Sequence, residues 1–170
     1  MNEPKKRKTT RLAEGNYSAS GSVFITICTE NKKCVLSRID TDVLDENGSP
    51  TVRLLPCGKI AEKYLKEMSG FYKGISIDRF VIIPNHIHFI LTIENDNETD
   101  AEAEQPIKNS IVSRFISTFK RFCNKEYGGN IWQYRSYDHI IRNPRDYDDH
   151  SAYIADNPRR WVYDKLYTPE

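Results

Sequence analysis

The amino-acid sequence predicts an α+β fold of the ferredoxin-like, split β-α-β type, with one antiparallel sheet and one helix added at the C-terminal side. Three observations lead to this prediction. The hydrophobic pattern alternates between strand and helix periods in the order strand, helix, strand, strand, helix, strand, helix. The sequence contains no internal repeat, and its 170 residues suffice for one domain with a buried core.

The first part of the chain supplies one strand and the first helix. Residues 22–29 are rich in β-branched and aromatic side chains, which favours a strand. The polar segment 45–50 contains Gly and Pro and predicts a turn, after which a short strand is expected at residues 52–55. Apolar side chains then recur at helical spacing from residue 58 to about residue 68.

The middle of the chain predicts two adjacent strands and a second helix. Residues 75–83 and 86–93 are strand-like, and Pro84-Asn85 between them suits a tight connection. From residue 107 to about residue 125, apolar side chains trace one face of an amphipathic helix: Ile107, Ile111, Val112, Phe115, Phe119 and Phe122.

The C-terminal part predicts a fourth main strand and the added helix. Residues 131–142 have the strand pattern. Asn143 followed by Pro144 is typical of a helix N-cap with proline at the first helical position. This last helix is expected to run to about Asn157, where Pro158 should end it.

Charge is unevenly distributed, which defines the domain organisation. The net charge is +1, yet residues 94–104 contain six acidic side chains and no basic one. We interpret residues 1–20 as a basic N-terminal arm, residues 21–165 as a single domain, and about residues 94–105 as an acidic surface loop. The remaining basic side chains permit a phosphate-binding face without requiring one.

The composition favours a soluble, cytoplasmic protein. Apolar residues make up 38% and charged residues 29% of the chain, and no apolar run approaches the roughly 20 residues that span a bilayer. The basic start is not followed by an apolar segment, so it is no secretory signal. The cysteines lack CxxC spacing and are expected to be reduced and mostly buried: Cys28, Cys34, Cys57 and Cys123.

His86 and His88 are the first candidates for chemistry. They are two residues apart on an expected strand, so both imidazoles should point to one face while Ile87, Phe89 and Leu91 point into the core. Two imidazoles so placed can chelate one metal ion and leave coordination positions open. The alternative is a pair of half-exposed histidines on a sheet surface.

Tyr153 and Asn157 are four residues apart on the last helix and therefore lie on one helical face. A phenol can attack phosphorus if its proton is removed and a cation neutralises the phosphate. The Asn157 carbonyl oxygen could complete a metal site beside it. Alternatively, Tyr153 packs the helix onto the sheet.

The residues 80–91, Phe-Val-Ile-Ile-Pro-Asn-His-Ile-His-Phe-Ile-Leu, resemble the metal-binding strand of single-tyrosine HUH transposases. Trp132-Gln133, the run 137–143, and Tyr153-Ile154 with Asn157-Pro158 resemble the C-terminal signature of the REP-associated branch of this IS200-like family. Residues 24–29 are similar to its first strand. The resemblance extends from about residue 7 to residue 162.

The resemblance implies an enzyme, a tyrosine HUH transposase acting as a single-stranded DNA endonuclease and strand transferase. His86, His88 and Asn157 would bind Mg²⁺ or Mn²⁺, and Tyr153 on the added helix would be the catalytic nucleophile. Attack would leave a 5′-phosphotyrosine and a free 3′-hydroxyl, and a second 3′-hydroxyl would reverse the step. The implied substrate is the hairpin of a repeated extragenic palindrome with a single-stranded flank.

Basic side chains acquire candidate roles in DNA binding on this interpretation. On the arm and on the second helix we expect these to contact DNA: Arg7, Lys8, Arg11, Lys108, Arg114, Lys120 and Arg121. Trp132, Tyr134 and Tyr137 could stack on unpaired bases, although core packing is the preferred interpretation. For Asp138, His139 and Arg142 we expect structural pairing near the site, and His150 could accept a proton.

Two other functions remain open. The first is a catalytically silent, single-stranded nucleic-acid-binding domain derived from a transposase, for which His86, His88 and Tyr153 would be dispensable. The second is a metal-dependent hydrolase that uses the His pair and water, with Tyr153 structural. The chain would act as a monomer, or as a homodimer with an exchanged last helix.

Overall fold

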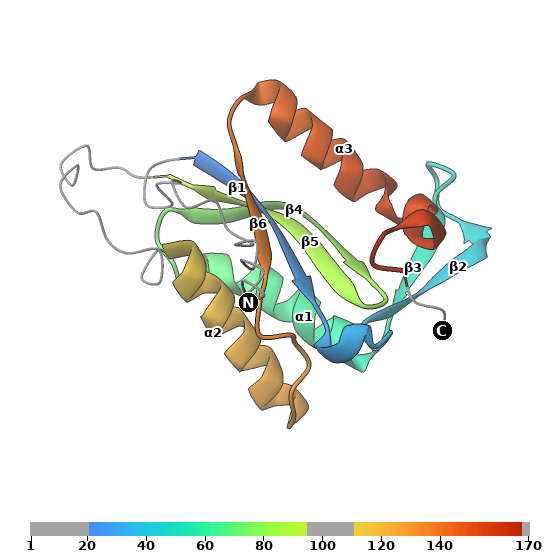
Figure 1. Ribbon diagram of the computed structural model, residues 1–170, viewed down its shortest axis with the longest axis horizontal. Helices are drawn as coiled ribbons and strands as arrows, with labels where there is room; N and C mark the ends of the chain where they lie inside the picture. Colours follow the sequence, from blue (N-terminus) through green and yellow to red (C-terminus); the bar gives the residue numbers. More distant parts are fainter. Residues whose placement is uncertain (1–20, 95–110, 168–170) are drawn as a thin grey trace, which may run out of the picture.

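The computed structural model describes residues 21–94 and 111–167, and it shows a four-stranded antiparallel sheet with helices on both faces (Figure 1). The strands lie in the order β4-β5-β1-β6, where β1 is Gly21–Cys28, β4 Ile75–Ile83, β5 His86–Ile93 and β6 Tyr137–Ile141. Helices α1 (Pro56–Glu67) and α2 (Ile111–Tyr127) pack on one face, and α3 (Pro144–Arg160) packs on the other. The predicted ferredoxin-like fold with an added C-terminal helix is confirmed.

The strand alternation divides the sheet into two chemically different faces. The main core, beneath α1 and α2, receives Ile25 and Ile27 from β1 and the odd-numbered residues Ile87, Phe89 and Leu91 from β5. The even-numbered residues of the same strands point toward α3, where a smaller cluster joins Phe24, Ile90 and Ile154. Because side chains alternate with period two, the sheet buries its core on one face and presents polar groups on the other.

The pairing of β1 with β5 sets which side chains meet on the α3 face. In this antiparallel register Thr26 lies opposite His88, and Cys28 lies opposite His86. A shift of β5 by one residue would turn both histidines into the core and move its core-facing apolar side chains to the α3 face. Burial of those apolar side chains therefore fixes the register.

A two-stranded hairpin is inserted between β1 and α1. It consists of β2 (Ser37–Leu44) and β3 (Pro50–Leu54). The turn between them was predicted, and Asp45 Oδ1 forms it by accepting hydrogen bonds from the backbone N–H groups of Asn47 and Ser49. Strand β2 was not predicted, because five of its eight residues are polar and its apolar residues do not alternate with them.

The fourth main strand is shorter than the predicted range 131–142. Trp132 makes only an isolated bridge to Thr29, and regular pairing starts at Tyr137. The backbone carbonyls between them are engaged elsewhere: Lys120 Nζ on α2 donates to the carbonyl oxygens of residues 133, 134 and 135 at 2.7, 3.1 and 3.3 Å.

The last helix continues past Pro158, contrary to the prediction that it would stop there. It ends at Arg160 and leads into a 3₁₀ turn, Trp161–Tyr163. Proline costs one hydrogen bond but has a helical φ, so a position in the last turn is tolerated. The predicted N-cap is confirmed, since Asn143 Oδ1 accepts a hydrogen bond from the Asp146 N–H at 2.9 Å.

Several predicted features lie outside the described residues. These include the basic arm, residues 1–20, and almost all of the acidic loop at about residues 94–105. Among the described residues, no helix is long and apolar enough to span a membrane. None of the four cysteines, all of which are described, forms a disulfide; Cys57 and Cys123 are buried, and Cys28 and Cys34 are partly exposed.

A close approach between α1 and the start of β2 yields a stability prediction. A Cβ atom at Gly58 would overlap the carbonyl oxygen of Leu36, which accepts a hydrogen bond from the Leu55 N–H. We expect Gly58→Ala to lower the free energy of unfolding by about 1–3 kcal/mol, as overpacking does. Gly70→Ala is the control, because a Cβ there meets nothing within 4 Å. Urea unfolding of both variants measures the difference, and equal stabilities would contradict this packing.

Candidate active site

His86 and His88 lie buried between β5 and α3. Their side chains point to the same face of the sheet, as predicted, and are 0% and 3% exposed. The prediction of half-exposed rings, as an alternative to a metal site, is wrong. Their Nε2 atoms face each other at 3.0 Å, and the Phe24 and Trp161 rings lie beside them.

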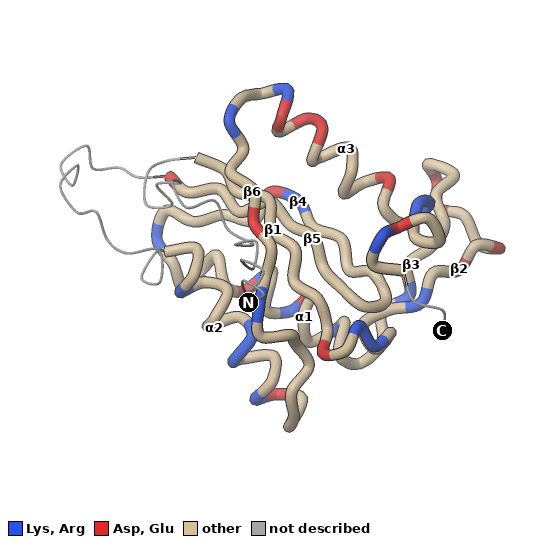
Figure 2. Tube along the Cα trace, viewed as in Figure 1, with Lys and Arg blue, Asp and Glu red and all other residues tan. Residues whose placement is uncertain are grey.

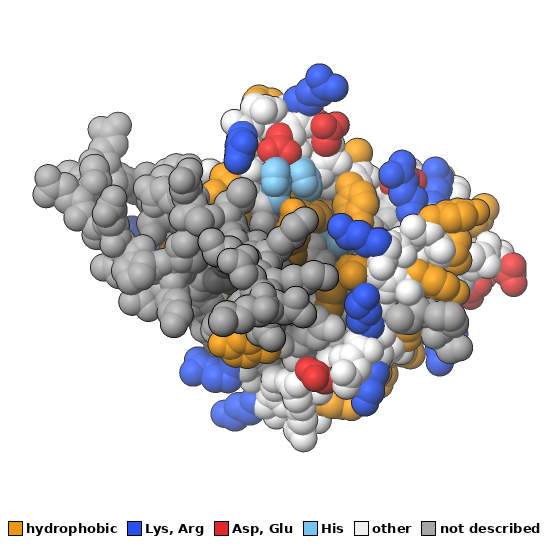
Figure 3. All heavy atoms as spheres, viewed as in Figure 1, with side chains coloured by type: hydrophobic (Ala, Val, Ile, Leu, Met, Phe, Trp, Pro, Cys, Tyr) orange, Lys and Arg blue, Asp and Glu red, His pale blue; other side chains and the backbone are white. Residues whose placement is uncertain are grey.

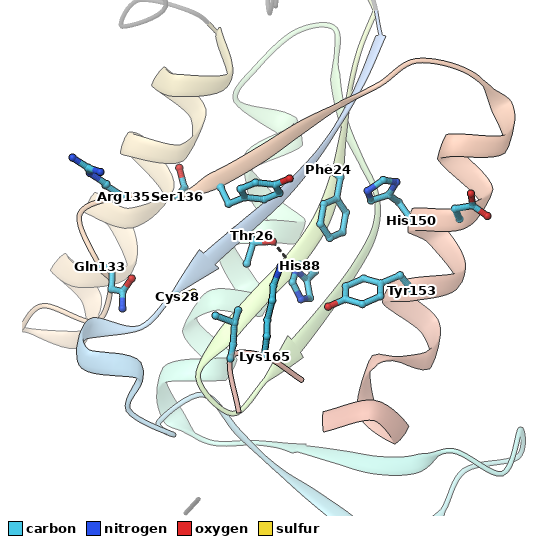
Figure 4. Close-up of a pocket in the computed structure, with 13 residues that line it drawn as sticks. Phe24, Thr26, Cys28, His88, Gln133, Arg135, Ser136, His150, Tyr153 and Lys165 are labelled. Atoms are coloured by element: carbon cyan, nitrogen blue, oxygen red, sulfur yellow. Dashed lines mark hydrogen bonds between the residues drawn. The ribbon is translucent and has the colours of Figure 1, made fainter. Parts of the chain in front are cut away.

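A chain of hydrogen bonds fixes the two rings. Asn85 Nδ2 donates to the Leu166 carbonyl oxygen at 2.8 Å, so Asn85 Oδ1 is the acceptor that faces His86 Nδ1 at 2.7 Å. His86 Nδ1 therefore bears the proton, and His86 Nε2 accepts from His88 Nε2–H. His88 Nδ1 then accepts from the Thr26 hydroxyl at 2.8 Å (Figure 4).

Both imidazoles are neutral near pH 7. Burial lowers the pKa of His86 from its usual 6.5 to about 4; Lys32 also lowers it and Asp164 opposes the shift. Burial also lowers the pKa of His88 well below 6.5, and neighbouring His86 adds to the effect. Neutral imidazole is the form that binds metal ions.

Tyr153 reaches this pair from α3. Its ring centre is 5.2 Å from that of His88 and 6.0 Å from that of Phe24. Its hydroxyl donates a hydrogen bond to Asp164 Oδ2 at 3.1 Å. Burial, followed by the charge of Asp164, raises the pKa of Tyr153 above 10, so the hydroxyl is protonated at neutral pH beside a carboxylate able to take its proton.

Asn157 lies one turn beyond Tyr153 on the same face of α3 and is 1% exposed. Neither its Oδ1 nor its Nδ2 atom makes a well-formed hydrogen bond among the described residues, although the side chain lies close enough to Tyr153 to lower the pKa of that phenol. A buried amide without well-formed hydrogen bonds is costly, so an additional group at this position would be favoured.

The donor atoms suit a divalent cation. Ligand atoms of His86, His88 and Asp164 all lie within 4.8 Å of one another. Two ligands that bind an ion at about 2.1 Å and at right angles are about 3.0 Å apart, which matches the separation of the Nε2 atoms. Asp164 is a ligand candidate that sequence reasoning missed, because nothing in its spacing relates it to the His pair.

A pocket of about 580 Å³ opens beside His88 and Tyr153 (Figure 4). Its walls come from β1, α3 and the segment before β6, with Phe24 and Thr26 among the lining residues. Two cationic side chains, Arg135 and Lys165, also line it. Neither was predicted to bind DNA: Arg135 lies within residues 131–142, which were predicted to form a strand, and Lys165 lies in the segment after the last helix.

The predicted DNA-binding residues lie apart from this pocket or outside the described residues. Arg7, Lys8, Arg11 and Lys108 are not described. Arg114, Lys120 and Arg121 belong to α2, the helix on the opposite face of the sheet (Figure 2). Arg114 and Arg121 are exposed, whereas Lys120 holds the 133–135 backbone.

The aromatic residues near the pocket differ in their environments. Trp132 is buried against Phe119 in the core, as preferred from the sequence. For Tyr134 and Tyr137 the preference for core packing is wrong, because they are 97% and 51% exposed. The expected pairing of His139 is present, with Asp146 as its partner.

No protein-family model matches the chain. It is 30% identical to an uncharacterized protein of Haemophilus influenzae over 95% of this chain and 93% of that protein. It is 33% identical to the REP-associated tyrosine transposase of Escherichia coli over 53% of this chain and 49% of that protein. A putative REP-associated tyrosine transposase of Haemophilus influenzae is 27% identical over 48% of each chain. The match therefore spans about half the length of these two named relatives.

Among solved structures, the chain is similar to a REP-associated tyrosine transposase bound to a REP hairpin. The TM-score is 0.59 and the identity 21%, over 91% of this chain and 77% of that chain. At this identity the likeness concerns the fold alone.

The two buried imidazoles predict a pH-dependent stability. Their pKa values are lower in the folded than in the unfolded chain, so unfolding takes up protons, and the free energy of unfolding decreases as the pH falls from 6.5 toward 4. We expect a loss of up to about 1.4 kcal/mol per pH unit for each histidine. Urea unfolding of the metal-free chain at several pH values measures it. The His86→Gln/His88→Gln variant should lose most of this dependence, and an unchanged slope would contradict the assignment.

Proposed function

We propose that this chain, which is similar to REP-associated tyrosine transposases over about half of its length and shares the fold of one of them, belongs to that family and cleaves and rejoins single-stranded DNA with Tyr153 as the nucleophile. One observation supports this most strongly: the Tyr153 ring lies 5.2 Å from the ring of buried His88, and its hydroxyl donates a hydrogen bond to Asp164, whose carboxylate lies beside the His pair. A tyrosine that only packed α3 onto the sheet would need neither the carboxylate nor the pocket beside it.

The substrate that we propose is hairpin DNA with a single-stranded flank. The similar solved structure is that of a transposase bound to a REP hairpin. In this chain, the pocket beside Tyr153 is lined by Arg135 and Lys165, which suit backbone phosphates, and by the half-exposed ring of Tyr137, which suits stacking on an unpaired base.

Tyr153 and Asp164 would perform the chemical step together. The phenol oxygen attacks the scissile phosphorus, and a bond from Tyr153 to phosphorus replaces the bond to the 3′-oxygen. Asp164 accepts the phenol proton and returns a proton, through solvent, to the leaving 3′-oxygen, which becomes a hydroxyl. The products are a 5′-phosphotyrosine and a free 3′-hydroxyl. Attack by a second 3′-hydroxyl reverses these changes and restores Tyr153.

His86, His88 and Asn157 would hold a divalent cation, Mg²⁺ or Mn²⁺, and Asp164 would be a further ligand candidate through Oδ1, the oxygen that does not face the Tyr153 hydroxyl. The cation, when bound, would neutralise charge on the scissile phosphate. Thr26 and Asn85 orient the imidazoles from behind. To hold the cation, His88 Nε2 would have to be free of its proton, which would place that proton on Nδ1 with the Thr26 hydroxyl as its acceptor.

Covalent capture of DNA tests the proposed nucleophile. A labelled single-stranded hairpin incubated with the full chain and Mn²⁺ or Mg²⁺ should yield a protein–DNA adduct on a denaturing gel. Tyr153→Phe should abolish the adduct, whereas Tyr134→Phe, the exposed-tyrosine control, should retain it. Cleavage without an adduct would assign the cut to water and a metal hydrolase. Binding without cleavage under either metal would identify a silent DNA-binding domain.

The role of Thr26 leads to a prediction about metal affinity. Thr26→Val removes the oxygen that orients His88, and such partners of metal ligands typically account for about 10- to 100-fold in affinity. We expect a Mn²⁺ dissociation constant raised by that factor in calorimetric titration. Thr26→Ser keeps the hydroxyl and should bind like the wild type. Equal affinities for the valine and serine variants would refute this orientation of His88.

A further inference from the structure

All four histidines of the chain belong to two clusters on the α3 side of the sheet, and only the first cluster has a role in the proposed reaction. The second cluster consists of His139 on β6 and Asp146 and His150 on α3. Ligand atoms of these three residues lie within 4.8 Å of one another.

The side chains of this second cluster converge on one point. His139 Nε2 is 3.0 Å from Asp146 Oδ2, and His150 Nδ1 is 3.1 Å from Asp146 Oδ1. The two rings are stacked, with centres 4.7 Å apart and planes 19° apart. Both imidazoles thus present a nitrogen to the same carboxylate from the same side.

The cluster is open enough for an ion to enter. The side chains of His139, Asp146 and His150 are 28%, 20% and 23% exposed. Figure 3 shows histidine side chains at the surface beside acidic ones, where α3 crosses the sheet. A partly exposed site also lets water supply the remaining ligands.

We propose that His139, Asp146 and His150 form a second metal site, specific for a transition-metal ion such as Zn²⁺, which ties strand β6 to helix α3. Two imidazoles and one carboxylate are typical zinc ligands, with water as the fourth. Mg²⁺ prefers oxygen ligands, so two imidazole nitrogens out of three disfavour it.

The surroundings of Asp146 support this proposal. Burial raises the pKa of Asp146, but hydrogen bonds from the Arg142 N–H and from His139 outweigh it, and the net pKa is lowered. The carboxylate is therefore ionised under ordinary conditions. Its anchoring is rigid, because the Arg142 N–H donates to Oδ2 at 3.0 Å and Asn143 caps the Asp146 N–H. His150 Nδ1 also lies 2.8 Å from the Asp146 carbonyl oxygen, a contact that an ion at Nδ1 would replace.

An ion at this site would act on the helix that bears Tyr153. His150 lies one turn before Tyr153, and its ring packs against Phe24 at 4.6 Å between centres. A metal bond from α3 to β6 would join the start of the helix to the edge strand and thereby fix the approach of Tyr153 to the His86–His88 pair.

Zinc stoichiometry in the full chain tests the proposal. The His86→Ala/His88→Ala variant removes the first cluster, and after dialysis against Zn²⁺ it should retain one ion per chain by elemental analysis. Adding His139→Ala should abolish zinc binding or weaken it strongly. Removal of a residue that only orients a metal ligand typically weakens binding by about 10- to 100-fold, and loss of the ligand itself should cost more. Asp146→Asn in the same background keeps an acceptor for the Arg142 N–H and should weaken binding similarly.

Asp148→Asn is the matched control, because it makes the same charge change on an exposed position of α3 outside the cluster. Circular dichroism verifies that each variant is folded. Co²⁺ in place of Zn²⁺ gives a second readout, since its visible spectrum reports nitrogen and oxygen ligands. A folded His86→Ala/His88→Ala variant that binds no zinc would overturn the proposal. Zinc retained after both His139→Ala and Asp146→Asn would overturn it equally, by assigning the ion to other residues such as the cysteines.

Discussion

The burial of two imidazoles side by side on one strand is the constraint on which the rest of this structure depends. Each ring has two polar nitrogens that must be satisfied away from water. Asn85 and Thr26 satisfy the outer nitrogens, and the inner nitrogens satisfy each other. This arrangement requires the β1–β5 register that sets Thr26 opposite His88, and it requires the segment after α3 to return so that the Leu166 carbonyl fixes the Asn85 amide.

The sequence predicted the secondary structure well where the local hydrophobic pattern agrees with burial in the fold. The two strands 75–83 and 86–93 have the predicted bounds, because Pro84-Asn85 separates two runs rich in β-branched and aromatic residues, and strand side chains alternate between the two faces with period two. The same period placed His86 and His88 on one face. The prediction was poorer for β2, whose residues are mostly polar, and for residues 131–136, where a lysine from α2 replaces a neighbouring strand as the hydrogen-bond partner.

Long-range side-chain pairing accounts for what could not be predicted at the site. Asp164 meets Tyr153 only because the chain turns back after Arg160, and its contact with the His pair has no counterpart in sequence spacing. Likewise, His139 and His150 are eleven positions apart on different elements, and Asp146 joins them across the loop that connects β6 to α3. Structural pairing of His139 was predicted, but the sequence could not identify Asp146 as its partner.

Lys120 has a consequence for how DNA-binding defects in this chain are understood. It belongs to the helix layer behind the sheet, yet it holds the backbone of residues 133–135, whose Gln133 and Arg135 line the pocket on the other side. Loss of its ammonium group would displace the pocket wall that bears Arg135, one of the side chains proposed to contact backbone phosphates. DNA affinity and the number of counterions released on binding would then both fall even if Lys120 itself touched no phosphate.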